Sequence, residues 1–430
     1  MTKSQARALL DGDRDAAARL AALPLKPLPT NFVERPWGGL RIREYKGVSP
    51  LDHQPRNPGA GLGEAFEIAA YDADEEARQY PSILELGDGS RVSLPELLAT
   101  HGETLLGREF VARHGACFPL LPKTLDVAEL LSVQGHPEGN PEAYLIIDAD
   151  PGATLRLGFA RDIDPEPFKR ELTAGRADQQ RLLDAVTLDA AALQTVLKPW
   201  LAARDDGVER VLPAFAGKLA QGVEPAVLVP LLERLKALYW SVLDSMNAIP
   251  VRAGQVIYNA NPPRIAAAAG KAPSAEVHAL GNPEGREILA LEVRRPGPTF
   301  RAWDNVRFPL RAVDVDAAID ALNLRRTAPE EFLVEPQPVA GRRGVFCSVD
   351  GEAFRIEHLR PRPGALVDVP AEPPHCLHLL AGEVALERPD GTPLASLRRG
   401  EAALVPIGVG AYRARALGDG VELIKASVPV

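Results

Sequence analysis

Cysteine is scarce in this sequence, with Cys117, Cys347 and Cys376 the only examples among 430 residues. The three lie far apart and form no Cys-x-x-Cys pair, which excludes a disulfide framework and a zinc site built from thiolates. Long apolar runs are lacking as well, so no membrane span is expected. Charged residues such as Arg14 and Arg19 interrupt the first 24 residues, which therefore do not read as a signal peptide. We expect a cytoplasmic protein in a reducing compartment.

An excess of positive charge is also missing. The sequence has 49 basic and 58 acidic residues, a net charge of −9 and a pI of about 5.5. This balance argues against nucleic acid or an anionic membrane as a partner, and leaves room only for a local basic pocket that could bind phosphate. Apolar residues make up 46% and charged residues 25%, as in a soluble globular protein. The length suits two or three domains.

What the sequence does contain is an alternation between strand-like and helical segments. Short apolar or alternating runs such as "GLRIREY" and "ATLRLGF" recur between turn signals, which is typical of a β-sandwich or barrel. Between Pro165 and about Ile249 the period becomes helical, with Leu228, Leu231 and Leu235 on one face. Strand-like runs then return and continue to the end of the sequence.

The last hundred residues resemble a cupin jelly roll. In "LLAGEVALERPDGTPLASLRRGEAALVPIG" a hairpin turns at Asp390-Gly391, and a second turn at Gly400 precedes another strand. We predict an α+β protein of two cupin-like jelly-roll β-sandwiches, the first interrupted by a helical subdomain. The predicted parts are a helical extension at 1–29, a first cupin-like domain at 30–164 and 250–325, a helical insert at 165–249, and a C-terminal cupin-like domain at 326–430.

A group of polar residues stands between two apolar runs in "LLSVQGHPEGNPEAYLIIDAD". On a strand, Gln134 and His136 project to the same face, and Glu142 follows after a short turn. His278 lies at the end of another predicted strand, in "AEVHALGNP". Imidazole nitrogen, amide oxygen and carboxylate are competent ligands for a divalent cation such as Zn²⁺, so these four residues could form a metal site.

The spacing alone leaves alternatives open. A single histidine such as His136 is more often a hydrogen-bonded structural residue than a ligand. His375 and His378 in "PPHCLHLL" look like a second metal pair, but no acidic partner follows them. We interpret that segment as a structural turn into a strand.

Six segments carry a resemblance to a known family. They are "ERPWGG" (34–39), "GEAFEIAAY" (63–71), "FPLLPKTLDVAELLSVQGHPE" (118–138), "EAYLIIDADPGATLRLGF" (142–159), "VHALG" (277–281) and "LEVRRPGPTFRAWD" (291–304). In order and rough spacing these segments resemble type I mannose-6-phosphate isomerase, a zinc-dependent cupin enzyme. The resemblance covers residues 30–160 and 250–325, and the C-terminal cupin fits more loosely.

The resemblance implies roles for individual residues. The metal ligands, for one Zn²⁺ per chain, would be Gln134, His136, Glu142 and His278. The phosphate-binding lysine and serine would be Lys123 and Ser132, the active-site arginine Arg301, and the glutamate of a Glu-Ile-Gln-Gln run Glu292. From the residues alone, apolar flanks weaken the alternative of a solvated strand-edge lysine at 123. For the arginine, a surface salt bridge remains an alternative.

The implied activity is a zinc-dependent aldose–ketose isomerisation of mannose 6-phosphate and fructose 6-phosphate through an enediol. The expected partner is therefore a small sugar phosphate, and the oligomeric state is left open. Either Glu292 or a metal-held water could be the general base. Two alternatives are an isomerase for a different sugar or sugar phosphate, and a non-catalytic sugar-binding cupin.

The sequence departs from the family pattern near the expected substrate. Arg294 and Arg295 replace a Gln-Gln pair, and "PGP" (296–298) stands where an acidic residue is usual. An insertion, "PPRIAAAAGKAPSA", precedes the segment that contains His278. If the 294–298 loop borders the pocket, activity on mannose 6-phosphate should be weak or the preferred sugar should differ, with phosphorylated substrates still favoured.

Overall fold

Two antiparallel sheets form a first β-sandwich in this computed structural model, which describes residues 4–49, 61–71, 78–270 and 272–429. The seven-stranded sheet runs β1 (Phe32–Arg35), β2 (Gly61–Phe66), β5 (Lys123–Val127), β12 (Ile288–Arg294), β7 (Glu142–Ala149), β10 (Val256–Asn259), β14 (Leu333–Val334). The five-stranded sheet runs β13 (Phe300–Trp303), β6 (Val133–Gly135), β11 (His278–Ala279), β8 (Thr154–Phe159), β9 (Met246–Pro250). A shared apolar cluster, with Leu125 and Ile146 from the first sheet and Leu155 and Ile249 from the second, fills the space between them.

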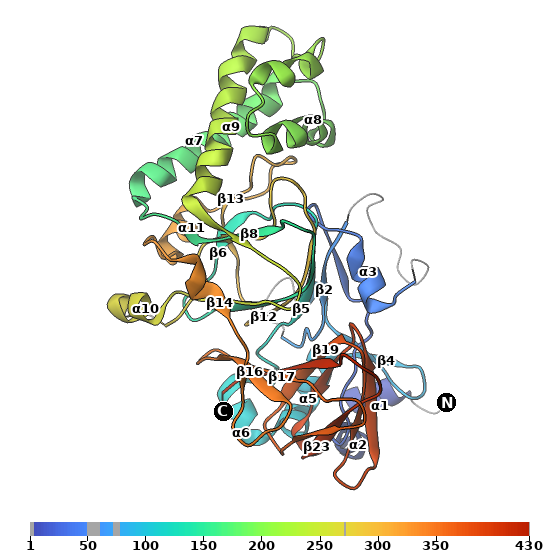
Figure 1. Cartoon of the computed structure of the whole chain (residues 1–430). Helices are drawn as coiled ribbons and strands as arrows, with labels where there is room; N and C mark the ends of the chain where they lie inside the picture. The colour runs from blue at the N-terminus through green and yellow to red at the C-terminus, as the bar shows by residue number, and fades with distance from the viewer. Residues whose placement is uncertain (1–3, 50–60, 72–77, 271, 430) are drawn as a thin grey trace.

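The C-terminal part of the chain builds a second sandwich with its own core. Its six-stranded sheet runs β15 (Gln337–Pro338), β16 (Val345–Asp350), β17 (Arg355–Leu359), β24 (Glu422–Ser427), β19 (His375–Ala381), β22 (Ala402–Val405). Its four-stranded sheet runs β18 (Leu366–Val369), β23 (Tyr412–Ala416), β20 (Glu383–Glu387), β21 (Pro393–Arg398). The predicted α+β fold with two sandwiches is therefore confirmed (Figure 1).

A helical layer covers the outer face of the five-stranded sheet (Figure 1). It consists of α7 (Pro165–Ala185), α8 (Ala190–Ala202), α9 (Leu228–Ser245) and α11 (Val315–Ala321). Asp164 caps α7 and Pro165 occupies its first turn, as expected for a helix start. The apolar face predicted for α9 is buried, with Leu232 and Leu235 at most 1% exposed. Every helix in the described ranges is too short or too polar to cross a membrane.

Two boundaries differ from the predicted parts. Strand β9 pairs with β8, so residues 246–249, predicted as the end of the helical insert, belong to the first sandwich. Strand β14 pairs with β10, so residues 333–334, predicted in the C-terminal part, also complete the first sandwich. Strand β9 follows α9 directly, without the glycine or proline that usually marks a change of element, so the sequence pattern did not reveal the boundary.

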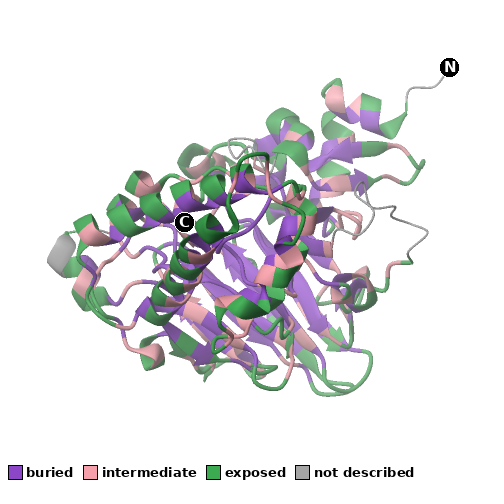
Figure 2. Ribbon diagram, turned by 90° about the horizontal axis from the view of Figure 1, so that it is seen from above, coloured by how far each residue is buried: buried purple, intermediate pink, exposed green. Residues whose placement is uncertain are grey.

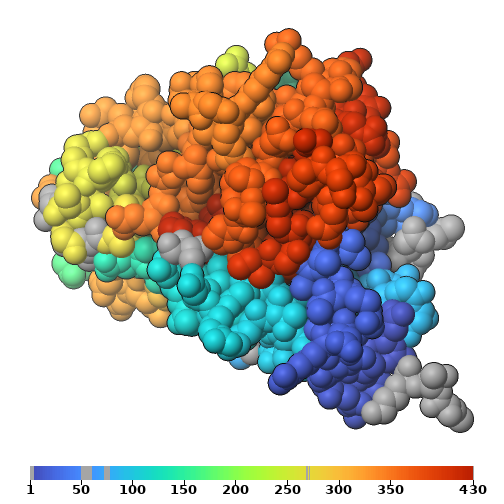
Figure 3. Space-filling model, turned by 90° about the horizontal axis from the view of Figure 1, so that it is seen from below, coloured from blue at the N-terminus to red at the C-terminus, as the bar shows by residue number. Residues whose placement is uncertain are grey.

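The N-terminal segment, predicted as a helical extension, forms two helices. Helix α1 (Gln5–Leu10) and helix α2 (Arg14–Ala21) are separated at Gly12, whose φ of 94° favours glycine, and Asp13 caps the second helix. Their inner faces are buried against α5 (Leu94–Leu106), and Leu25 then pairs with Leu404 of β22. Figure 3 shows this segment lying against the C-terminal residues. The remaining described helices of this region are α3 (Arg41–Lys46) and α6 (Arg108–His114), next to the hairpin β3 (Ile83–Glu85) and β4 (Arg91–Ser93).

The alternation of side chains along the strands positions a polar site inside the first sandwich. On β5, β7 and β12 the inward residues Leu125, Ile146 and Ala290 belong to the apolar core. On the same three strands the inward residues nearer one end are Lys123, Glu142 and Glu292. Strands β5 and β12 are buried over their whole length and β7 over its first five residues, and Figure 2 shows buried strands at the centre of the molecule. These charged groups therefore lie in the interior and need partners there.

We expect Asp126→Ala to lower the free energy of unfolding by about 1–2 kcal/mol. Helix α3 has no capping side chain of its own, and the buried Asp126 Oδ2 accepts hydrogen bonds from the backbone N–H groups of Arg41 (2.6 Å) and Ile42 (2.9 Å). Burial raises the pKa of Asp126 to about 6, so denaturation should be followed above pH 7, where the carboxylate is charged. The control is Asp148→Ala, because that side chain is 59% exposed. Equal loss in both variants would contradict the capping role.

Candidate metal centre and active site

The four predicted metal ligands meet at one end of the first sandwich. Gln134 lies on β6, His136 directly follows that strand, and His278 begins β11, where its backbone pairs with that of Gln134. Glu142 begins β7 in the opposite sheet. Because an inward residue from each sheet contributes, the cluster bridges the two layers of the sandwich.

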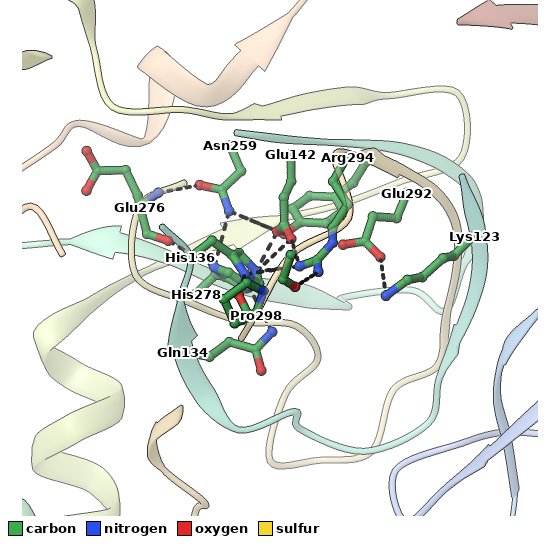
Figure 4. Close-up of polar contacts among 12 residues, drawn as sticks. Lys123, Gln134, His136, Glu142, Asn259, Glu276, His278, Glu292, Arg294 and Pro298 are labelled. Atoms are coloured by element: carbon green, nitrogen blue, oxygen red, sulfur yellow. Dashed lines mark hydrogen bonds and ion pairs between the residues drawn. The ribbon is translucent and has the colours of Figure 1, made fainter. Parts of the chain in front are cut away.

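The Glu142 carboxylate lies between the two imidazoles (Figure 4). Its Oε1 is 2.7 Å from His136 Nε2, and its Oε2 is 3.4 Å from His278 Nε2. Gln134 Nε2 is 3.1 Å from the same His278 nitrogen. Among the described residues, these two histidines and the glutamate are the one group of three or more His, Cys, Asp or Glu side chains whose ligand atoms could hold a metal ion, and all three are buried.

Backbone carbonyls orient both imidazole rings. His136 Nδ1 is 3.1 Å from the Pro298 carbonyl, and His278 Nδ1 is 2.9 Å from the Glu276 carbonyl. A carbonyl can only accept, so we assign the ring proton to Nδ1 in both cases, which leaves each Nε2 as an acceptor directed at Glu142. Histidines that ligate metals are commonly held in this way. Asn259 Nδ2 also lies 3.2 Å from His278 Nδ1, but both nitrogens are donors in this tautomer, so the contact is not a hydrogen bond.

The donor atoms of the cluster suit a cation. Burial, and to a smaller extent Arg294, lowers the pKa of His136 to about 4. Burial opposes ionisation of Glu142, but the contacts with the two histidines and Arg294 hold the pKa of this carboxyl well below its usual range. His136 Nε2 and Glu142 Oε1 lie 2.7 Å apart. These nitrogen and oxygen donors fit a divalent cation.

Arg294 also reaches the cluster. Its Nη1 is 3.1 Å from His136 Nε2 and 3.2 Å from Glu142 Oε1. Arg295 points elsewhere and donates from Nε to the Ala353 carbonyl at 3.1 Å. Of the two arginines that replace the family's glutamines, one is therefore inside the site and the other contacts the second sandwich.

A cavity of about 80 Å³ lies beside the ligand cluster. Lys123 forms its buried side, with Nζ 3.3 Å from Glu64 Oε1 and 3.7 Å from Glu292 Oε2. Five basic side chains line the cavity, against two acidic ones: Arg35, Lys123, Arg294, Arg301 and Arg311, and Glu64 and Glu292. The basic surplus suits an anionic ligand, in contrast to the negative charge of the whole chain.

The two carboxyls in this cavity have opposite pKa shifts. Burial raises the pKa of Glu292 to about 8. Burial also acts on Glu64, but Arg35 and Lys123 overcome it and lower the pKa of that carboxyl to about 2. Divergent pKa values within one pocket are a common feature of acid–base sites, and here they single out Glu292 as the group able to exchange a proton near neutral pH.

Ser132 connects the cavity to the ligand cluster. Its hydroxyl donates to Gln134 Oε1 at 2.9 Å and accepts a hydrogen bond from Arg301 Nε at 3.2 Å. Arg301 is held further by a bond from Nη1 to the Ala312 carbonyl at 2.9 Å. The structure thus brings all eight predicted site residues into one connected region.

Sequence reasoning overlooked five residues that contact this region: Arg35, Glu64, Tyr144, Asn259 and Arg311. Tyr144 donates to the Glu142 carboxylate and lies two residues further along β7, so strand alternation could have identified it. Arg35 and Glu64 stand in segments that carried the family resemblance. Asn259 and Arg311 come from a strand end and a connecting segment, with no recognisable signal.

The second histidine pair does not form a site. His375 and His378 are three residues apart on β19 and therefore point to opposite faces. His375 Nε2 lies 2.8 Å from the Tyr412 hydroxyl in the second sandwich, while His378 Nε2 lies 2.9 Å from the Tyr45 hydroxyl. The interpretation of this segment as a structural entry into a strand is confirmed.

Comparison with known proteins connects these features to one family. No family model matches the chain. The mannose-6-phosphate isomerase of Streptococcus mutans is 29% identical over 174 residues, which cover 38% of this chain and 48% of that protein. The match thus spans about half the length of this curated relative.

Solved structures match over nearly the whole chain. The mannose 6-phosphate isomerase of Bacillus subtilis has a TM-score of 0.59 and 18% identity, and the match covers 94% of this chain and 99% of that one. A mannose 6-phosphate isomerase solved with zinc and yttrium has a TM-score of 0.58 and 15% identity, with 95% and 99% covered. The chain is therefore similar to mannose-6-phosphate isomerases in part of its sequence and shares their fold.

Proposed function

We propose that this protein is a zinc-dependent aldose–ketose isomerase that interconverts mannose 6-phosphate and fructose 6-phosphate. The observation that carries the proposal is the buried cluster of His136, Glu142 and His278 beside a basic cavity that contains Lys123 and Glu292. The similarity of this chain to mannose-6-phosphate isomerases in sequence and fold supports the same reaction.

We propose Gln134, His136, Glu142 and His278 as the ligands of one zinc ion. A zinc ion would supply positive charge that orients and polarises oxygens of the sugar without redox chemistry. In the structure the amide nitrogen of Gln134 faces His278, and Ser132 donates to the amide oxygen. Rotation of the amide by half a turn would present its oxygen to a metal, and the Ser132 hydroxyl could then accept from the amide nitrogen.

The basic residues of the cavity are proposed to bind the phosphate and the charge of the enediolate. Lys123 is 5% exposed and lies next to Glu292, so we assign it to the reacting oxygens or an anionic end that enters the cavity. Arg301 is oriented by Ser132, and we assign it to the charge that develops during the reaction. Ser132 is proposed to contact the substrate and to hold Arg301 in place.

Proton transfer between the two reacting carbons is assigned to Glu292. It projects from β12 into the cavity beside Lys123, and it can exist in both protonation states near neutral pH. A group with these properties can take the proton from one carbon and return it to the other. Because the substrate is a sugar phosphate and the three cysteines are free thiols, we propose that the reaction takes place in the cytoplasm.

A second candidate is an isomerase for a different phosphorylated sugar. It is favoured by Arg294, which replaces a neutral amide inside the site. The test is a panel of phosphorylated and free aldoses and ketoses at equal concentration. Turnover of mannose 6-phosphate above all others supports the first candidate, and preference for another sugar phosphate supports the second. Absence of turnover throughout the panel would contradict both.

Arg301→Ala is expected to lower kcat and kcat/KM equally, by about 10²–10³-fold, because its contact is assigned to charge that exists only in the transition state. Arg301→Lys should recover part of the loss, since it keeps the charge but not the hydrogen bond to Ser132. Steady-state kinetics on the preferred sugar phosphate measure both. Unchanged kinetics in the alanine variant would show that Arg301 serves only its hydrogen bonds to Ser132 and Ala312.

A further inference from the structure

Arg294 is a buried cation in direct contact with the proposed metal ligands. The residue is 4% exposed, and its Nη1 lies 3.0 Å and 3.1 Å from the two ring nitrogens of His136 and 3.2 Å from Glu142 Oε1. Its other terminal nitrogen, Nη2, donates to the Gly297 carbonyl at 2.7 Å. The guanidinium is therefore held between the ligand cluster and the 294–298 loop (Figure 4).

The same electron pair cannot serve both the arginine and a metal ion. The Nε2 of a neutral imidazole has one lone pair, and its Nδ1 proton is directed at the Pro298 carbonyl. A zinc ion would bind that lone pair at about 2.0–2.1 Å. The N–H of Arg294 would then have to release His136, and its positive charge would remain beside a divalent cation in a buried site.

We infer that Arg294 acts as an internal counter-ion, which pairs with Glu142 and His136 in the metal-free protein and competes with the divalent cation for them. The inference rests on the proposed metal site and goes beyond it, because it assigns this chain a weaker metal affinity than the same site would have with a neutral residue at position 294. Arg294 also lines the cavity, so the guanidinium can move toward that space when a metal binds.

Zinc affinity of chelator-treated protein tests the competition directly. Competition with a chromogenic chelator at fixed pH should show at least about tenfold tighter zinc binding by Arg294→Gln than by the natural sequence, because a like charge has been removed from the site. Arg294→Met should behave in the same way and serves if the glutamine variant does not fold. The matched control is Arg295→Gln, which removes an adjacent arginine that points away from the ligands and should leave the affinity unchanged.

Thermal melting provides a second measurement. The difference in melting temperature between Arg294→Gln and the natural sequence should be negative without metal and should vanish or become positive with zinc. Without metal, Arg294→Gln should melt at least about 2 °C below the natural sequence, because Glu142 loses its buried counter-ion. With saturating zinc, the variant should melt at the same temperature or higher. An arginine with only a structural role would instead lower the melting temperature in both states.

The outcomes separate this inference from the proposed function. If the natural sequence binds zinc and both Arg294 variants bind it equally or more weakly, the competition is refuted while the metal site stands. If neither the natural sequence nor the variants bind zinc, the metal site fails and the inference fails with it. Tighter binding in the Arg294 variants together with unchanged binding in Arg295→Gln supports the inference.

Discussion

His136→Ala is expected to lower zinc affinity by at least about 100-fold and to abolish measurable isomerase activity. Loss of a residue that only supports a ligand costs 10–100-fold in affinity, so loss of a ligand itself should cost more. The imidazole is fully buried, and its Nε2 lies 2.7 Å from Glu142 Oε1. Its removal takes away one donor and leaves space where the ring held the carboxylate. Metal analysis of the purified variant and a coupled assay of turnover measure the two effects.

The matched control for this change is His375→Ala. That histidine is also buried and hydrogen-bonded, but its partner is Tyr412 in the second sandwich. The His375→Ala substitution should lower the free energy of unfolding and leave the zinc content unchanged. The second sandwich has its own core, so its fold should also persist in His136→Ala. A His136→Ala protein that keeps its zinc would show that His136 is a structural residue, the alternative that the sequence left open.

Glu292→Gln is expected to lower kcat by about 10²–10⁴-fold while the metal content stays unchanged. Glutamine keeps the size of the side chain but cannot exchange a proton, and Glu292 is not among the proposed ligands. In deuterated water the natural protein should exchange the hydrogen on the reacting carbon with solvent, and the variant should lose this exchange together with turnover. Loss of turnover alone could come from poor substrate binding, so the exchange measurement assigns the defect to proton transfer.

Turnover of Glu292→Gln within a few-fold of the natural protein would contradict its assignment as the proton-transferring group. The base would then be another group, such as a metal-held water. Glu64 is a less suitable substitute, because Arg35 and Lys123 lower the pKa of its carboxyl to about 2, which makes it a weak base at neutral pH.

Strand alternation explains why part of the metal site could be predicted from the residues themselves. To predict that Gln134 and His136 project together, it is enough to expect that their segment is extended, because residues two apart on a strand share a face. The roles of Lys123 and Glu292 came from the family resemblance, and the structure adds that their backbones pair directly across β5 and β12. The same rule should have separated Arg294 from Arg295. Arg294 is two residues from Glu292 and points inward, whereas its neighbour must point outward.

Residues supplied by distant segments could not be predicted in this way. Arg311 lies outside the segments that carried the resemblance and reaches the cavity through the packing of a connecting segment against the sandwich. Asn259 ends β10, and its contact with His278 depends on how two sheets face each other. The limits of the helical insert were misjudged for a related reason, because β9 is defined by its pairing with β8 and not by a local turn signal.

We propose that isomerisation depends on a metal ion held by Gln134, His136, Glu142 and His278. The test is to measure zinc content and mannose 6-phosphate turnover on the same protein sample, before chelation, after chelation and after zinc is restored. We predict about one equivalent of zinc per chain, loss of turnover on chelation and recovery on addition of Zn²⁺. Full turnover by protein that contains less than about a tenth of an equivalent of any divalent metal would contradict the claim.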